Sequence, residues 1–181
     1  MTKTFICIAS GPSLTANDCA LVSGSGYPVI AVNSSWRAMP ECQHIYAADF
    51  SWWEKYHRDI PPGAMRWTSS ISASIQLGVN YFPHPDTKTF NSGLRAIQLA
   101  IRLGARRVLL LGYDCCIEAG SHWHGDHPVG LKTPDESSVT RWHAEFTRLA
   151  AALSGIEILN CSRRSALACF PLSTIEAALH A

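Results

Sequence analysis

The chain begins with an apolar run, residues 4–9, that ends abruptly in Ser10-Gly11-Pro12-Ser13. A run of this length followed by Gly and Pro predicts a buried strand and a tight turn, and the polar residues 15–18 after it predict the start of a helix. A strand, a turn of small residues and a helix form the phosphate site of many α/β proteins, because backbone N–H groups and the positive end of the helix attract an anion. The start of the chain therefore predicts nucleotide binding, without identifying the nucleotide.

Strand-like and helix-like segments alternate along the rest of the chain. Further strands are predicted at residues 28–33, 44–49, 65–69, 107–114 and 156–161, and helices at residues 50–56, 91–104, 134–153 and from 173 onward. Residues 70–90 are predicted to be a loop with weak strand. The alternation predicts a Rossmann-like three-layer α/β fold with a mostly parallel sheet. At 181 residues, of which 47% are hydrophobic, the chain fits one domain over residues 1–181.

The composition narrows the class of partner and the location. A formal charge of +1 argues against broad electrostatic attraction to nucleic acid or membranes. The seven cysteines form no Cys-x-x-Cys pair and are predicted to be buried, reduced thiols. The chain has no signal-sequence pattern and no apolar run near the roughly 18 residues that a membrane span needs. We therefore expect a cytoplasmic protein without a membrane span.

Polar residues end several of the predicted strands. Parallel strands bring their carboxyl ends to one edge of the sheet, which is where open α/β sheets bind ligands. Each polar residue alone also fits a simple strand end, but their shared placement predicts a binding site built from Ser10, Asn33, Asp49, Asp114 and Asn160.

Four segments together carry a family resemblance. They are residues 9–14, the strand end at Asn33, the helix that starts at Asn91-Ser92-Gly93 and leads into Leu111-Gly112-Tyr113-Asp114, and residues 159–167. In this order they resemble the bacterial lipooligosaccharide sialyltransferases and the wider superfamily that includes archaeal hydroxymethylpterin pyrophosphokinase-like proteins. Phage and prophage proteins are similar as well.

The resemblance implies a nucleotide-sugar donor, of CMP or UDP type, bound as a substrate and not as a tightly held cofactor. Backbone N–H groups of Gly11, Ser92 and Gly93 would meet phosphate, and Asn33 and Asp114 would contact ribose or base. Together with the strand ends and the first turn, the expected binding residues are Ser10, Gly11, Pro12, Ser13, Asn33, Asp49, Ser92, Gly93, Asp114 and Asn160. The chain departs from the family at Ser10, where the family has Asn, and it lacks the tyrosine pair that follows Gly-x-Asp.

A histidine-rich segment, residues 121–128, lies in a predicted loop over residues 119–133. Its His-x-His-x-Asp-His letters match the metal motif of metallo-β-lactamase-type hydrolases, but that fold places the motif early and needs further ligands downstream. Because the loop follows the strand that ends at Asp114, we expect His124 or His127 to act as a general base, with Asp126 orienting it. An unrelated metal site and a loop held by His–Asp hydrogen bonds are the alternatives.

Two further pairs of side chains have two interpretations each. Trp52 and Trp53 can stack on a base or sugar ring, but core packing is the more common use. Arg163 and Arg164 can offset phosphate charge, and paired arginines are more often solvated.

These observations predict a small glycosyltransferase that moves a sugar from a nucleotide donor to a carbohydrate or other hydroxyl acceptor, with inversion and without a metal. The alternatives are a Mg²⁺-dependent pyrophosphokinase, a non-catalytic nucleotide-binding or interaction module, and a metal-dependent hydrolase. Assembly into a homo-oligomer is left open.

Overall fold

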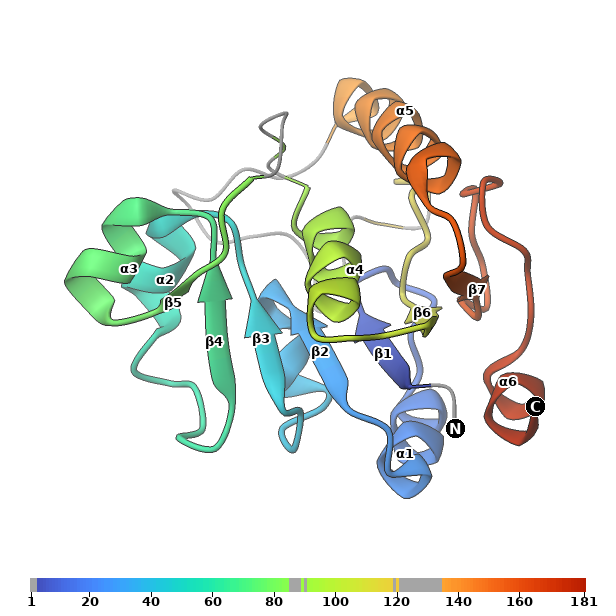
Figure 1. Cartoon of the computed structure of the whole chain (residues 1–181), viewed down its shortest axis with the longest axis horizontal. Coiled ribbons are helices and arrows are strands. Elements are labelled where there is room, and N and C mark those ends of the chain that lie inside the picture. The colour runs from blue at the N-terminus through green and yellow to red at the C-terminus, as the bar shows by residue number, and fades with distance from the viewer. Residues whose placement is uncertain (1–2, 85–88, 90, 119, 121–134) are drawn as a thin grey trace.

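The chain folds around an all-parallel sheet, shown in Figure 1 as a computed structural model that describes residues 3–84, 89, 91–118, 120 and 135–181. The strands within these ranges are β1 Thr4–Ile8, β2 Val29–Val32, β3 His44–Tyr46, β4 Met65–Thr68, β5 Asn80–Tyr81, β6 Arg107–Leu111 and β7 Glu157–Asn160. Their order in the sheet is β5-β4-β3-β2-β1-β6-β7, and all neighbours are parallel. The predicted parallel α/β architecture is confirmed.

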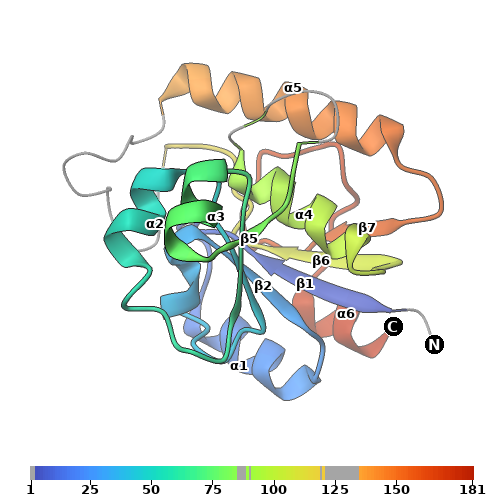
Figure 2. The ribbon, with the colours of Figure 1, turned by 60° about the vertical axis from the view of Figure 1, so that its left-hand side comes forward.

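Helices cover both faces of the sheet. They are α1 Ala16–Ser25, α2 Phe50–Tyr56, α3 Ile71–Leu77, α4 Ser92–Arg102, α5 Glu136–Ala152 and α6 Ile175–His180, with a 3₁₀ turn η1 Asn33–Arg37. Figure 2 shows α4 and α5 above the sheet and α1 and α6 below it. This is the predicted Rossmann-like three-layer arrangement.

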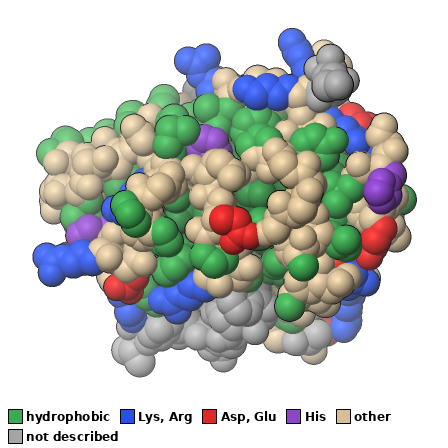
Figure 3. Space-filling view, turned by 90° about the horizontal axis from the view of Figure 1, so that it is seen from below, with side chains coloured by type: hydrophobic (Ala, Val, Ile, Leu, Met, Phe, Trp, Pro, Cys, Tyr) green, Lys and Arg blue, Asp and Glu red, His purple; other side chains and the backbone are tan. Residues whose placement is uncertain are grey.

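The surface carries charges of both signs. On the face seen in Figure 3, Lys and Arg side chains and Asp and Glu side chains are spread among hydrophobic and neutral polar ones. Within the described residues, no helix is both long and apolar enough to cross a membrane.

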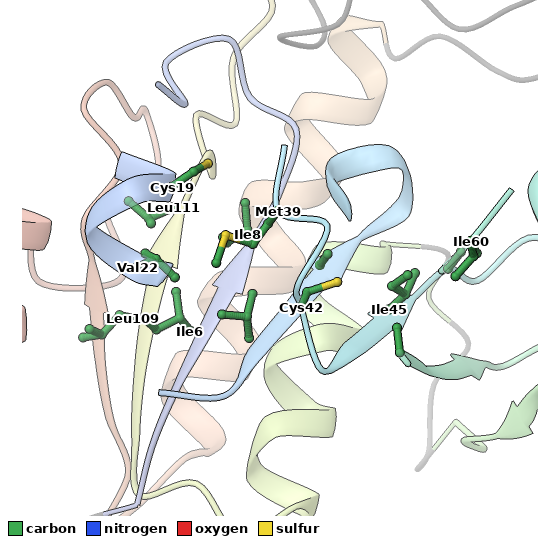
Figure 4. Packing of buried hydrophobic residues seen from close by; sticks show 14 of the residues in the cluster. Ile6, Ile8, Cys19, Val22, Met39, Cys42, Ile45, Ile60, Leu109 and Leu111 are labelled. Carbon is green, nitrogen blue, oxygen red and sulfur yellow. The ribbon is translucent and has the colours of Figure 1, made fainter. Parts of the chain in front are cut away.

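Two buried clusters hold the layers together, one on each face of the sheet. Along β1, Ile6 and Ile8 join one cluster, whereas Phe5 and Cys7 join the other. Successive side chains of a strand point to opposite faces, so a sheet covered on both sides needs apolar residues at every position. Figure 4 shows the first cluster, where Ile6 and Ile8 lie beside side chains of α1 and of the neighbouring strands.

The cysteines carry no disulfide. All seven are free, and four of them are buried, namely Cys7, Cys19, Cys42 and Cys161. Burial raises the pKa of the Cys42 thiol to about 12, so the thiol stays protonated and packs as a small apolar side chain.

The two adjacent tryptophans belong to the core. Trp52 is 3% exposed and Trp53 is fully buried, and their rings meet edge to face with centroids 4.9 Å apart. The Nε1 of Trp52 donates to Ser34 Oγ at 3.3 Å, and that of Trp53 donates to the Ala47 carbonyl at 2.9 Å. The interpretation of these rings as a stacking platform for a ligand is therefore wrong.

The segment predicted as a loop after β4 contains a helix. Ser70 caps α3, because its hydroxyl accepts a hydrogen bond from Ala73 N at 3.2 Å. The helix escaped prediction because it is only two turns long and its apolar Ile71 and Ile75 face outward, at 59% and 78% exposure, so its sequence has no apolar stripe. The weak strand expected in the same region is present as β5.

Candidate functional site

The site predicted at the strand ends lies where the strand order changes direction. The chain runs outward from β1 to β5 on one side of the sheet and then crosses to β6 on the other side of β1. Open α/β sheets bind ligands at such a switch point, beyond the carboxyl ends of the two diverging strands. Here the turns after β1 and β6 meet directly, because Gly11 N donates to the Gly112 carbonyl at 2.8 Å.

Asp114 folds back onto the turn after β1. Its side chain accepts two hydrogen bonds from Ser13, one from the backbone N at 2.9 Å and one from Oγ at 2.6 Å. Asp114 is only 2% exposed. Burial raises the pKa of its carboxyl, although the hydrogen bonds from Ser13 and the positive charge of Arg164 oppose that shift.

Gly11 leaves the space that Asp114 occupies. A Cβ at this position would lie 2.2 Å from Asp114 Oδ1 and 2.5 Å from the Gly112 carbonyl oxygen. The N–H of Gly11 is the group expected at a phosphate, and in this structure it is bonded to Gly112. The turn is therefore closed on the end of β6, with Ser10 and Pro12 half-buried beside it.

The N-terminus of α4 reaches the same edge. Asn91 caps the helix through its Oδ1, which accepts from Leu94 N at 3.0 Å. Ser92 Oγ accepts from Ala48 N, just beyond β3, at 3.1 Å, and the Tyr113 hydroxyl donates to the Gly93 carbonyl at 3.0 Å. Among the residues that the structure describes, no acceptor is bonded to the N–H groups of Ser92 and Gly93. The described part of the chain therefore anchors this helix end and supplies no acceptor for these two N–H groups.

The end of β7 braces the end of β6. Asn160 is fully buried, and its Nδ2 donates to Ser165 Oγ at 2.9 Å. Ser165 Oγ donates to the Tyr113 carbonyl at 2.6 Å, and Ser162 Oγ accepts from Tyr113 N at 2.9 Å. The Asn160 side chain thus supports the end of β6 through Ser165, and its amide is hydrogen-bonded within the protein.

Two further predicted residues lie at the ends of β2 and β3. Asn33 follows β2 directly and has a φ of 49°, a left-handed backbone conformation that Asn adopts more readily than most residues. Asp49 is exposed and precedes α2, where its carbonyl accepts from Trp53 N at 3.3 Å. Both side chains stay predicted nucleotide contacts.

Arg95 places a buried positive charge in the first turn of α4. Its guanidinium donates to the carbonyls of Phe82 at 2.9 Å and Pro83 at 2.6 Å and lies 4.1 Å from the centroid of the Phe82 ring. Its other partners, Gln98 and Tyr46, are also neutral. Within the described ranges, no carboxylate pairs with Arg95. Arg95 is not among the residues predicted from the sequence, and its charge adds to the positive end of the helix.

No protein-family model matches the sequence, and no curated protein matches it significantly. Among solved structures, the chain is similar to the MAf glycosyltransferase from Magnetospirillum magneticum AMB-1, with a TM-score of 0.66 and 12% sequence identity. That match covers 98% of this chain and 34% of the glycosyltransferase, so the chain spans about a third of its length. Thiamin pyrophosphokinases from Geobacillus thermodenitrificans and Bacillus subtilis align with TM-scores of 0.43 and 0.44 and identities of 14% and 12%, over 86% of this chain and 58% and 59% of theirs. At these identities the likeness concerns the fold.

The histidine segment lies outside the described residues. The predicted roles of His124, Asp126 and His127 therefore stay predictions. Within the part of the chain that the structure describes, no group of three His, Cys, Asp or Glu side chains is placed to hold a metal ion.

Arg163 forms an ion pair with a buried carboxylate. Its Nη2 lies 2.7 Å from Oδ1 of Asp18, whose side chain is 1% exposed, and its Nε also donates to that carboxylate. Thr15 bonds the other carboxylate oxygen from its backbone N and hydroxyl. Arg164 instead pairs with Glu118 at the surface, where both side chains are exposed. The interpretation of Arg163 as a residue that offsets phosphate charge is therefore not supported, because its guanidinium already pairs with Asp18.

We expect Arg163→Gln to lower the melting temperature at pH 7 by a few degrees. Burial favours a raised pKa for Asp18, but the hydrogen bonds from Arg163 and Thr15 and the charge of Arg163 together lower it. A lowered folded-state pKa stabilises the protein above the ordinary Asp value of about 3.9 and loses that contribution as the pH falls through the folded-state pKa. Thermal melts between pH 7 and pH 2 should show the difference from the wild type shrinking at the acid end. Arg164→Gln is the control and should leave the melting temperature unchanged, because exposed ion pairs contribute little.

Proposed function

We propose that this chain binds a nucleotide-sugar donor of CMP or UDP type and transfers its sugar to a carbohydrate or other hydroxyl acceptor. The observation that carries the proposal is the N-terminus of α4 at the switch point of the sheet, where the N–H groups of Ser92 and Gly93 have no acceptor among the described residues. A diphosphate or monophosphate ester supplies the anion that such a helix end favours.

The local charge supports an anionic ligand. The first turn of α4 has no acidic side chain, and it contains Arg95, a fully buried cation whose partners among the described residues are neutral. A cation near the positive end of a helix is unfavourable by itself, and its burial adds a desolvation cost. A bound phosphate would offset both effects. The overall charge of +1 is too small to attract an anion, so binding needs a local site of this kind.

The similarity to a glycosyltransferase fold supports the same class of reaction at the level of architecture. In the proposed reaction, the acceptor hydroxyl oxygen bonds to the anomeric carbon as the bond from that carbon to the phosphate oxygen breaks. The electron pair leaves with the nucleotide, and the configuration at the anomeric carbon inverts. His124 or His127 would take the hydroxyl proton, with Asp126 holding the imidazole in place. The N–H groups of Ser92 and Gly93 would stabilise the leaving phosphate.

A binding panel tests the proposal. CMP, UDP, CMP-sugars, UDP-sugars and ATP are added to the protein with and without Mg²⁺, and thermal melts and calorimetry report binding. A ligand at 100 times its Kd should stabilise the folded state by about 2.7 kcal/mol. Stabilisation by a cytidine or uridine compound without metal supports the proposal, and turnover of that donor by the wild type but not by His124→Ala/His127→Ala tests the base. Stabilisation by ATP only with Mg²⁺ would favour a phosphotransferase, and no stabilisation by any compound would contradict the proposal.

Ser92→Pro isolates the contribution of one backbone donor. Proline is favoured at the first helical position, and Asn91, with φ −74° and ψ 93°, is extended and so lies outside the α region that proline disfavours in the residue before it. The variant therefore removes the Ser92 N–H without breaking α4. We expect it to bind the donor about tenfold more weakly than Ser92→Ala, because one hydrogen bond to a charged group is lost.

Ser92→Ala is the matched control. It also loses the hydroxyl that accepts from Ala48 N, but it keeps its own N–H. Calorimetric titration of both variants with the donor identified in the panel measures the ratio of their Kd values. Equal Kd values would show that the phosphate does not bind to the Ser92 N–H.

A further inference from the structure

We propose that Asp114 is a positioning residue, which fixes the turn after β1 through Ser13 and does not itself bind the nucleotide or a metal ion. The inference deepens the proposed function and, for its ligand-binding part, rests on it. It also replaces the role that the family resemblance implies for Asp114, which is a direct contact with ribose or base.

The geometry of the carboxylate leads to this assignment. One oxygen accepts from the Ser13 N and the other accepts from the Ser13 Oγ, at 2.9 and 2.6 Å. The side chain of a residue that is 2% exposed offers almost no surface to a ligand. The Gly11 backbone packs directly against this carboxylate, because even a methyl group on its Cα would lie 2.2 Å from Oδ1.

The backbone around Asp114 is held in place by the segment that follows β7. Its carbonyl accepts from Ala166 N at 2.8 Å, and the preceding Tyr113 is bonded through its N and its carbonyl to Ser162 and Ser165. Gly112 has a φ of 69° and contacts the turn so closely that a Cβ there would lie 2.4 Å from the Ala9 carbonyl oxygen. The end of β6 is thus held by several hydrogen bonds, and Asp114 fixes the position of Ser13 relative to it.

Asp114→Asn separates a role in shape from a role in charge. An Asn side chain has the same outline, and its Oδ1 can accept from the Ser13 N. The Ser13 hydroxyl can act as donor or acceptor, so it can turn to accept from Asn Nδ2. The two hydrogen bonds then survive without the negative charge. A carboxylate that bound a metal ion, or that had to be charged against the ligand, would lose its function in the same variant.

The experiment compares Asp114→Asn with Asp114→Ala by two measurements. The first is hydrogen exchange of the Ser13 amide, followed by NMR without any ligand. Exchange should stay within about threefold of the wild-type rate in Asp114→Asn and rise at least about tenfold in Asp114→Ala, because only the second variant removes the acceptor. The second is calorimetric titration with the donor found in the panel, where Asp114→Asn should restore most of the affinity that Asp114→Ala loses.

Val22→Ala is the matched control for lost stability. It opens a cavity in the core beneath α1, and it should leave the Ser13 amide protected under conditions where the variant is folded. If Asp114→Asn exchanges and binds as poorly as Asp114→Ala, the charge is required and the inference is wrong. If no nucleotide compound binds the wild type, the proposed function fails, and the exchange of the Ser13 amide still decides whether Asp114 fixes the turn.

Discussion

Gly11→Ala is expected to lower the free energy of unfolding by about 3 kcal/mol, at the upper end of the range for an overpacked core position. The added Cβ would lie 2.2 Å from Asp114 Oδ1 and 2.5 Å from the Gly112 carbonyl oxygen. A flexible surface side chain would move away, but Asp114 is bonded twice to Ser13 and the Gly112 carbonyl is backbone that accepts from Gly11 N. The strain must therefore separate the two turns that meet at the switch point.

Urea denaturation measures the stability change, and titration with the donor measures its effect on the site. We expect donor binding to fall together with stability, because the turn after β1 and the end of β6 move apart. Gly24→Ala is the control, since Gly24 is an exposed residue of helix α1 with nothing within 4 Å of its would-be Cβ. That variant should gain about 0.5–1 kcal/mol from helix propensity. A Gly11→Ala protein as stable as the wild type would show that Asp114 is free to move.

The fold could be predicted from the sequence because the patterns that indicate its strands and helices are local. The runs that became β1, β2 and β6 are buried at every position and are apolar apart from their first residues Thr4 and Arg107, as a sheet covered on both faces requires. Small and polar residues end these runs, and Thr15 and Asn91 start the helices as predicted, each with a side chain that caps the first turn. α3 was missed because its burial depends on neighbouring helix α2 and on the sheet edge, not on a periodic pattern of its own.

The candidate site could be predicted only in part, because the direction of a polar side chain depends on partners that are far away in the sequence. The sequence places Asp114 and Asn160 at the carboxyl ends of two strands. In the structure Asn160 is the last residue of β7, whereas β6 ends at Leu111 and Asp114 lies in the segment that follows it. The sequence does not indicate that Asp114 turns toward Ser13 or that Asn160 is bonded to Ser165, since the first contact joins residues about a hundred positions apart. The burial of Arg95 could have been predicted from its spacing, because it lies four residues before Leu99 and so shares the buried face of α4.

Arg95→Ala is expected to be the most damaging single change, with a loss of about 4 kcal/mol in the free energy of unfolding. Two effects add. The truncation leaves a cavity at a fully buried position, and it leaves the carbonyls of Phe82 and Pro83 without the donor that they share. Removing a buried charge also removes its desolvation cost, which offsets part of the loss. We expect the orphaned carbonyls and the cavity to prevail, because the guanidinium also stacks on the Phe82 ring.

Arg95→Met separates the loss of stability caused by the cavity from the loss caused by the unpaired carbonyls. Methionine fills much of the volume, so the destabilisation that remains, about 2 kcal/mol, measures the unpaired carbonyls. Arg102→Ala, on the exposed side of the same helix, is the control and should change stability by less than about 0.5 kcal/mol. Urea denaturation of the three variants gives the stabilities, and titration of Arg95→Met with the donor shows whether the buried charge attracts the phosphate. If Arg95→Met matches the wild type in stability, the desolvation cost of the guanidinium equals the stabilisation from its hydrogen bonds, and the expected loss of stability is wrong.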